Sequence, residues 1–190
     1  MIALDPATRA DIAFIRQSTE VLKTTKGENT KVYRPQTGHR YYFNDITVDI
    51  IAAQEQFPFE YYSGDFNDSS TWCLFTIEGQ RCLLGGDGDK GGIKFVMETC
   101  TPEDMQLDVF TVLHHGHNTR DMFTDYCQIK TALFPVAKGQ LPAYRTNENN
   151  HLKEVVEEWF ASHDGTVVLT FPYRVGEAKR IPHFDWIYNK

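Results

Sequence analysis

Two short segments of the chain carry residues that could do chemistry. Residues 83–89 read LLGGDGD, an apolar stretch that ends in glycines and then in Asp87. Residues 112–117 read VLHHGH, a second apolar stretch that ends in a histidine cluster. The cluster consists of His114, His115 and His117. A carboxylate and imidazoles without a thiolate are ligands that suit Zn²⁺, Mn²⁺ or Fe²⁺, so the two segments together predict a metal site.

The elements around these segments should bring them together. A strand over 81–85, a helical stretch over 93–100 and a strand over 107–113 form a predicted β-α-β crossover. Such crossovers are right-handed, so both strand ends should lie at one edge of the sheet, where α/β proteins place their ligands. The same residues also allow a plainer interpretation, a turn in which Asp87 caps the following helix.

The remaining pattern predicts an α/β fold with a mixed sheet, antiparallel in its front half and built from β-α-β crossovers in its back half. Predicted helices cover residues 6–26, 93–100, 121–130 and 150–161, with a further helix start at 101–104. Predicted strands cover residues 31–34, 39–43, 46–52, 71–77, 81–85, 107–113, 131–136 and 166–171. We expect a single domain with a leading helix (1–30), the sheet and crossover helices (31–172) and a docked aromatic tail (173–190).

Composition limits the classes of function. With 190 residues, 41% hydrophobic and 24% charged, the chain has the make-up of a globular domain rather than of a disordered protein. The net charge of −7 disfavours a protein that holds nucleic acid by neutralising phosphates. The apolar runs are too short to span a bilayer and no secretory leader is present, so we expect no membrane partner. Four cysteines without a Cys-x-x-Cys motif favour a reduced, cytoplasmic protein.

Several segments follow one another in an order that resembles a known family. These are residues 67–70 (NDSS), 72–75 (WCLF), 83–87 (LLGGD) and 107–117 (LDVFTVLHHGH). The succession resembles the second half of a metallo-β-lactamase-fold hydrolase. It is most similar to the branch that contains the ComEC competence proteins and the choline-phosphate esterases of teichoic acid. The resemblance covers residues 46–171 and is specific at Gly86-Asp87 and at residues 114–116.

The resemblance implies a fold, a reaction and a set of site residues. The fold would be the C-terminal half of an αββα sandwich, and the reaction would be phosphoester or phosphodiester hydrolysis by a metal-activated water. Asp87 would bridge two metals, zinc or else manganese or iron, and one of His114 and His115 would be a further ligand. Asp87 and His115 would be the catalytic residues. Weaker candidates for substrate contact are Asn67, Ser69, His117 and His151. For His151 the sequence favours a surface residue at a helix start.

One feature of the family is missing. A complete enzyme of this fold has a His-x-(His/Asp)-x-Asp-His loop before the bridging aspartate, and no such cluster precedes Asp87 here. We therefore expect an incomplete domain that is inactive alone and is completed by an N-terminal half or by a homodimer. Apolar surface from Trp72, Leu74 and Phe110 would favour self-association.

Two other classes of function stay open. The first is a non-catalytic binding or scaffolding module that keeps the fold without the metal. The second is a nucleotide-binding α/β domain, which residues 85–92 (GGDGDKGG) support poorly because they lack the Gly-Lys-Ser/Thr ending of a phosphate loop. For the hydrolase, the substrate would be a small molecule or a phosphoester.

Overall fold

The computed structural model describes residues 35–53, 59–61, 65–136 and 146–182. The chain divides into two units, residues 1–35 and 36–190, and every element described below belongs to the second unit. The predicted helix over 6–26, the predicted strand over 31–34 and the aromatic residues of the tail beyond residue 182 lie outside the described residues.

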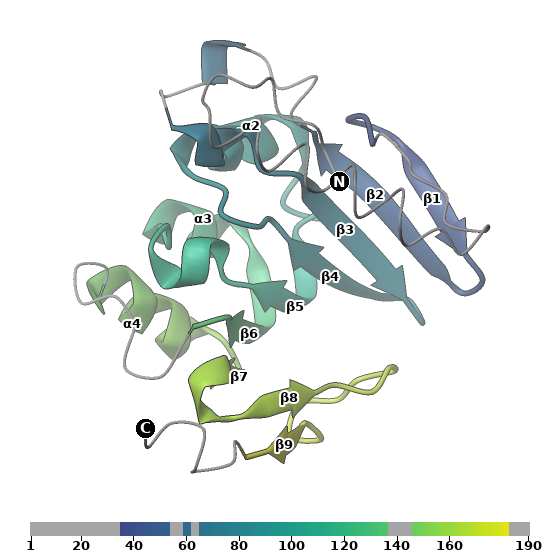
Figure 1. The fold of residues 1–190 in the computed structure, drawn as a ribbon, viewed down its shortest axis with the longest axis vertical. Helices are drawn as coiled ribbons and strands as arrows, with labels where there is room; N and C mark the ends of the chain where they lie inside the picture. The colour runs from purple at the N-terminus through teal and green to yellow at the C-terminus, as the bar shows by residue number, and fades with distance from the viewer. Residues whose placement is uncertain (1–34, 54–58, 62–64, 137–145, 183–190) are drawn as a thin grey trace, which may run out of the picture. The chain divides into compact units, whose positions relative to one another are not determined.

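A seven-stranded mixed sheet is the centre of the second unit (Figure 1). The strands follow their sequence order across the sheet, antiparallel from β1 to β4 and parallel from β4 to β7. They are β1 (Arg40–Phe43), β2 (Ile46–Ala52), β3 (Trp72–Ile77), β4 (Gln80–Leu84), β5 (Gln106–Thr111), β6 (Gln128–Phe134) and β7 (Glu158–Ala161). This arrangement confirms the predicted α/β class and its mixed sheet.

The two hairpins form where the sequence predicts them, for a local reason. Asn44 lies at a φ of 52° between β1 and β2, and Glu78 and Gly79 lie at 51° and 78° between β3 and β4. A two-residue loop with positive φ matches the twist of the strands that it joins. Asn and Gly reach that conformation at little cost, and they fix the register of the antiparallel half.

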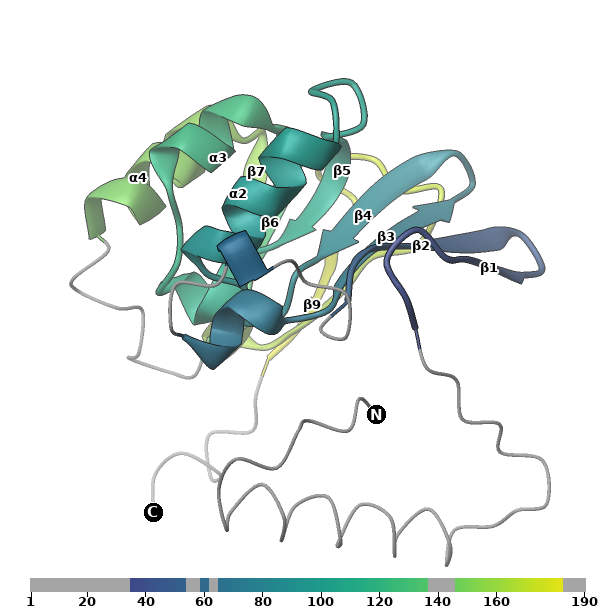
Figure 2. The same ribbon diagram turned by 90° about the horizontal axis from the view of Figure 1, so that it is seen from above.

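Three helices cover one face of the sheet (Figure 2). They are α2 (Lys90–Thr99), α3 (Asp121–Tyr126) and α4 (Thr146–Val155). Their apolar residues meet the strands in the main core, to which Trp72, Leu74 and Phe110 also belong. The expectation that these three side chains form exposed apolar surface is therefore wrong, because the helices bury them.

The opposite face is covered by the segment that follows β7. Here β8 (Thr166–Val168) pairs with β9 (Lys179–Ile181) in a separate antiparallel sheet. Between them Tyr173 is buried against Cys82 and Val109. The Gln80 side chain holds the Tyr173 backbone at both ends, donating to its carbonyl at 2.7 Å and accepting from its N–H.

The back half departs from the predicted elements at its helix ends. The predicted helix over 150–161 is wrong after residue 155, because Glu158–Ala161 forms β7 and pairs in parallel with β6. Phe160 and Ala161 are buried in this strand, whereas Trp159 is exposed. The predicted strand over 166–171 is accordingly shorter and lies in the small sheet, not in the main one.

One further predicted helix was too long, and another did not form. The helix expected over 121–130 ends at Tyr126, and β6 already begins at Gln128. The helix start expected at 101–104 is a closed turn instead. There Asp104 Oδ2 accepts hydrogen bonds from the backbone N–H and the hydroxyl of Thr101, both at 2.9 Å, and these bonds compete with a helix.

Candidate functional site

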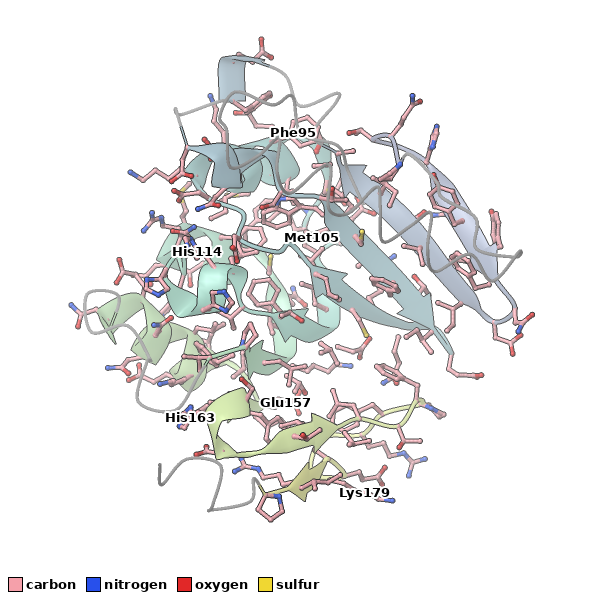
Figure 3. The ribbon with its side chains drawn as sticks, in the orientation of Figure 1. Phe95, Met105, His114, Glu157, His163 and Lys179 are labelled. Atoms are coloured by element: carbon pink, nitrogen blue, oxygen red, sulfur yellow. The ribbon has the colours of Figure 1, made fainter. Side chains whose placement is uncertain are left out.

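The loops after β4 and β5 meet at the carboxyl edge of the parallel strands, where Figure 3 labels His114. The backbone N–H of His114 donates to the carbonyl of Gly86 at 3.0 Å and so joins one loop to the other. Gly86 presents that carbonyl from a φ of +56°, a conformation that glycine adopts without steric cost. This single backbone bond brings Asp87 and His115 side by side.

The histidine loop is held in an unusual backbone conformation. His114 has φ 46° and ψ 49°, His115 has φ 57° and ψ 22°, and Gly116 follows at φ 88°. For residues other than glycine the left-handed region costs about 1–2 kcal/mol each, so the surroundings must stabilise it.

A buried asparagine on α4 supplies that stabilisation. Asn149 Nδ2 donates to the Gly116 carbonyl at 3.1 Å, and Asn149 Oδ1 accepts from the Thr119 hydroxyl at 2.5 Å. Asn149 is only 3% exposed, so both contacts are made away from solvent. Helix α4 thus fixes the loop through the side chain of Asn149, which the sequence analysis did not single out.

His115 is oriented with one nitrogen free. Its Nδ1 lies 2.5 Å from the backbone carbonyl of Pro135, which can only accept, so Nδ1 carries the proton. In the neutral ring Nε2 is then unprotonated, and it lies 3.6 Å from Asp87 Oδ1. That separation is too long for a hydrogen bond. It is shorter than two metal–ligand bonds of about 2.0–2.2 Å placed end to end, so one ion could touch both atoms.

His114 has the opposite arrangement. Its Nδ1 lies 3.0 Å from Asn118 Nδ2 and 3.4 Å from Asn67 Nδ2. Asn118 Nδ2 also lies 3.2 Å from the carbonyl of Gly88, which requires the amide nitrogen rather than the oxygen at that position. His114 Nδ1 therefore accepts, and in the neutral ring its proton is on Nε2. Of the two histidines, His115 is the one that offers a lone pair beside Asp87.

The turn that carries Asn67 is tied to the start of α2. Asp65 Oδ1 accepts from the Asn67 N–H at 2.9 Å, and the fully buried Asp68 accepts from the Gly91 N–H at 2.7 Å. Gly91 is required there, because a Cβ at this position would lie 1.9 Å from the carbonyl oxygen of Tyr61. These contacts place Asn67 beside His114.

The remaining predicted site residues are placed differently. The His117 ring lies 5.1 Å from the His114 ring, at the same loop. The side chain of Ser69 lies outside the described residues. His151 Nε2 lies 2.6 Å from Asp125 Oδ1, and this hydrogen bond raises the pKa of His151. Among the described residues His151 makes no hydrogen bond or ion pair with the Asp87 or His115 loop, so the structure does not join it to the site.

The interpretation of Asp87 as a helix cap is not supported by its position. Helix α2 begins at Lys90, and Asp89 is the residue that precedes it. The Asp89 side chain makes no capping bond and instead faces Arg120, with 3.4 Å between Oδ1 and Nη2. Asp87 is left half-exposed at the edge, directed toward His115.

The described residues contain no group of three or more His, Cys, Asp and Glu side chains close enough to hold a metal ion. Asp87 and His115 are a carboxylate and an imidazole that suit a metal ion, and no third such side chain lies close to them among the described residues. In the same part of the chain no helix is long and apolar enough to cross a membrane.

The fold and this pair of loops define an α/β protein with polar residues at the carboxyl edge of its parallel strands. Compared with protein-family models and with curated proteins, the chain gives no match. The resemblance to metallo-β-lactamase-fold hydrolases therefore stays a prediction from the motif residues.

Proposed function

We propose that the chain supplies part of the site of a metal-dependent hydrolase of the metallo-β-lactamase type, acting on a phosphoester or phosphodiester. The observation that carries this proposal is the Asp87–His115 pair. Its two facing atoms are 3.6 Å apart, and the Pro135 carbonyl places the single proton of the neutral ring on Nδ1, away from Asp87. A hydrogen bond to the second ring nitrogen is the usual way in which proteins orient a metal-bound histidine.

Asp87 and His115 are suitable metal ligands, but two protein ligands are too few for a tight site. Carboxylate and imidazole suit zinc, or else manganese or iron, whereas tight structural sites use four protein ligands and catalytic ones at least three. A metal at Asp87 and His115 would supply an activated water and a positive charge for the phosphoryl oxygens, and Asp87 could bridge to a second ion. The missing ligands would come from a second copy of the chain or from a separate N-terminal half.

The other residues of the site have roles that need no metal ligation. His114, with its proton on Nε2, can donate a hydrogen bond to an oxygen of a bound substrate, and its ring centroid lies 6.1 Å from that of His115. Asn118 and Asn67 orient that donor. A site with two protein donors should bind metal weakly, and we expect the chain alone to be inactive or nearly so.

Metal binding tests the proposal. Zn²⁺ would be titrated by calorimetry into the parent chain and into the Asp87→Asn, His115→Ala and His114→Ala variants. Uptake should fall by about tenfold or more in the first two, because each loses one of two donors, and should persist in the third. His151→Ala is the matched control, since it removes a histidine that also lies beside an aspartate. Zn²⁺ binding that survives both Asp87→Asn and His115→Ala would contradict the proposal.

A non-catalytic binding module is the second candidate function. It is favoured by one observation, the absence of a third metal donor among the described residues. The same titration separates the two functions. A parent chain that takes up no zinc, manganese or iron, alone or as an oligomer, would support the binding module over the hydrolase.

A further inference from the structure

A cavity of about 330 Å³ opens at the carboxyl edge of the sheet, between the ends of β5, β6 and β7 and strand β8. Its walls are mostly apolar and include Leu133, Phe160 and Val167. None of the described residues that line it has an ionisable side chain. Small-molecule sites have volumes of roughly 300–1,000 Å³ and are lined mainly by apolar groups, so this cavity has the size and character of one.

The cavity adjoins the Asp87–His115 pair through one residue. Pro135 lines the cavity, and its carbonyl accepts the hydrogen bond from His115 Nδ1. Thr111, the last residue of β5, lies in the wall four positions before His115. A ligand could therefore place an apolar group in the cavity while a polar group faces Asp87 and His115.

A larger cavity of about 710 Å³ lies at the opposite edge of the sheet and is a poorer candidate. Charged residues of both signs line it, and both of its cationic side chains already have partners. Lys130 Nζ lies 2.7 Å from Asp108 Oδ1, and Arg81 donates to the Glu103 carbonyl at 2.7 Å. It also lies at the amino ends of the parallel strands, whereas α/β sheets bind ligands outside their carboxyl ends.

We propose that the 330 Å³ cavity binds the alcohol part of the substrate, and that this part is a single aromatic ring or a short branched alkyl group. The inference rests on the proposed function and adds the substrate class to it. Attack of water on phosphorus would break the P–O bond, transfer a proton to the departing oxygen and leave the neutral alcohol in the cavity. A sugar or nucleoside would fit poorly, because its polar groups would lose water without gaining partners on these walls.

The size of the cavity supports a ring. An apolar cavity of about 150 Å³ is enough to hold benzene in a protein interior. The space beside β8 therefore accommodates one ring with a short extension. Burial of a ring typically gains a factor of about ten or more in affinity, which a binding experiment can resolve.

The first experiment uses benzyl alcohol, an aromatic ring without a phosphoryl group, and the ¹⁵N-labelled full chain. Benzyl alcohol should shift the amide resonances of Thr111, Gly165 and Thr166, and its ring protons should show NOEs to the methyl groups of Leu133 and Val167. Val167→Phe, which fills the cavity, should abolish these shifts. Val168→Phe is the matched control, because this neighbour is exposed and does not line the cavity.

The second experiment compares phenylphosphonate with methylphosphonate in the presence of Zn²⁺. The phenyl compound should bind about tenfold or more tightly, and Val167→Phe should remove that difference. No benzyl alcohol shifts and no NOEs at the cavity would overturn the inference, as would equal losses in Val167→Phe and Val168→Phe. Failure of the proposed function gives a different result: ring binding persists, but Asp87→Asn leaves phosphonate binding unchanged.

Discussion

Two histidine–aspartate pairs in this protein have the same chemical groups and different surroundings. His151 and Asp125 lie on α4 and α3, with Nε2 and Oδ1 in direct hydrogen-bond contact at 2.6 Å. His115 and Asp87 lie on loops at the sheet edge, with a separation of 3.6 Å between the corresponding atoms. In the first pair the imidazole and the carboxylate bond directly to each other. In the second pair the Asp87 oxygen and the unprotonated Nε2 of His115 face each other without a hydrogen bond.

The backbone and the second ring nitrogen account for the difference. His151 lies in an ordinary helix, and the contact with Asp125 is the interaction that raises its pKa. His115 lies at positive φ, and its Nδ1 is already bonded to Pro135. The hydrogen bond from Nδ1 to Pro135 thus orients the His115 ring and keeps it from forming a direct hydrogen bond with Asp87. Substitutions near the Asp87–His115 pair should disturb the residues that hold its loops, whereas substitutions at the other pair should remove the His151–Asp125 hydrogen bond.

The largest effect should come from Gly91→Ala. The new methyl group would lie 1.9 Å from the Tyr61 carbonyl oxygen and 2.8 Å from the Asp68 carboxylate, so the turn carrying Asn67 must move. We expect the free energy of unfolding to fall by about 3 kcal/mol, measured by urea denaturation. Lys94→Ala, at an exposed position of the same helix, should change it by less than about 0.5 kcal/mol. Equal stability of the two variants would contradict the proposed role of the close contact.

Asn149→Ala should have the next largest effect. It leaves the Gly116 carbonyl and the Thr119 hydroxyl without their buried partner, which should cost about 2 kcal/mol in urea denaturation. Asn150→Ala is the matched control, because Asn150 is the exposed neighbour of the same type on the same helix. If the loop needs α4 to keep its conformation, Zn²⁺ uptake should also fall in Asn149→Ala and not in Asn150→Ala. Comparable losses of stability in both variants would contradict this support.

The sequence was sufficient to predict six of the seven strands of the main sheet and the meeting of two loops, and it was insufficient for the contacts that orient these loops. Alternating apolar residues and positive-φ turn residues fix β2, β3 and β4 locally, so their predicted bounds were nearly correct. Glu158–Ala161 was mistaken for helix because its strand character comes from pairing with β6, a contact between residues far apart in the chain. Local propensity carries no record of such a contact.

The same limit applies within the candidate site. Asp87 and the histidine cluster stand out by residue type, and the crossover rule indicates that they share an edge. Pro135 and Asn149 act through a backbone carbonyl and a buried amide, and neither residue type suggests a site. Asn118 had a usable signal, since it follows His114 by four positions in the same loop. The choice between His114 and His115 needed the partners of each Nδ1, which only the folded chain reveals.

The third prediction concerns pH and the helical pair. The hydrogen bond to Asp125 raises the pKa of His151 above the unfolded value of about 6.5. The pair therefore contributes its full stabilisation below about pH 6.5 and loses it as pH rises through the folded pKa. The difference in free energy of unfolding between the parent and His151→Gln should therefore shrink as pH rises from about 6.5 through the folded pKa. Asp125→Asn should reproduce that trend, and a difference that grows with pH would contradict the assignment.

The last prediction concerns the tautomers of His114 and His115, and its variant, Asn118→Ala, should change the stability least. At a pH where the rings are neutral, His114 and His115 should be opposite tautomers, with the proton on Nε2 of His114 and on Nδ1 of His115. Long-range ¹H–¹⁵N correlation spectra distinguish a protonated from an unprotonated ring nitrogen and so report each tautomer directly. Asn118→Ala should turn His114 into a mixture of tautomers because its principal donor is gone, and it should leave His115 unchanged because the Pro135 carbonyl is still present.

A His115 ring protonated at Nε2 in the parent chain would remove the lone pair that faces Asp87. The two histidine–aspartate pairs would then no longer differ in the feature that qualifies one of them as a metal site.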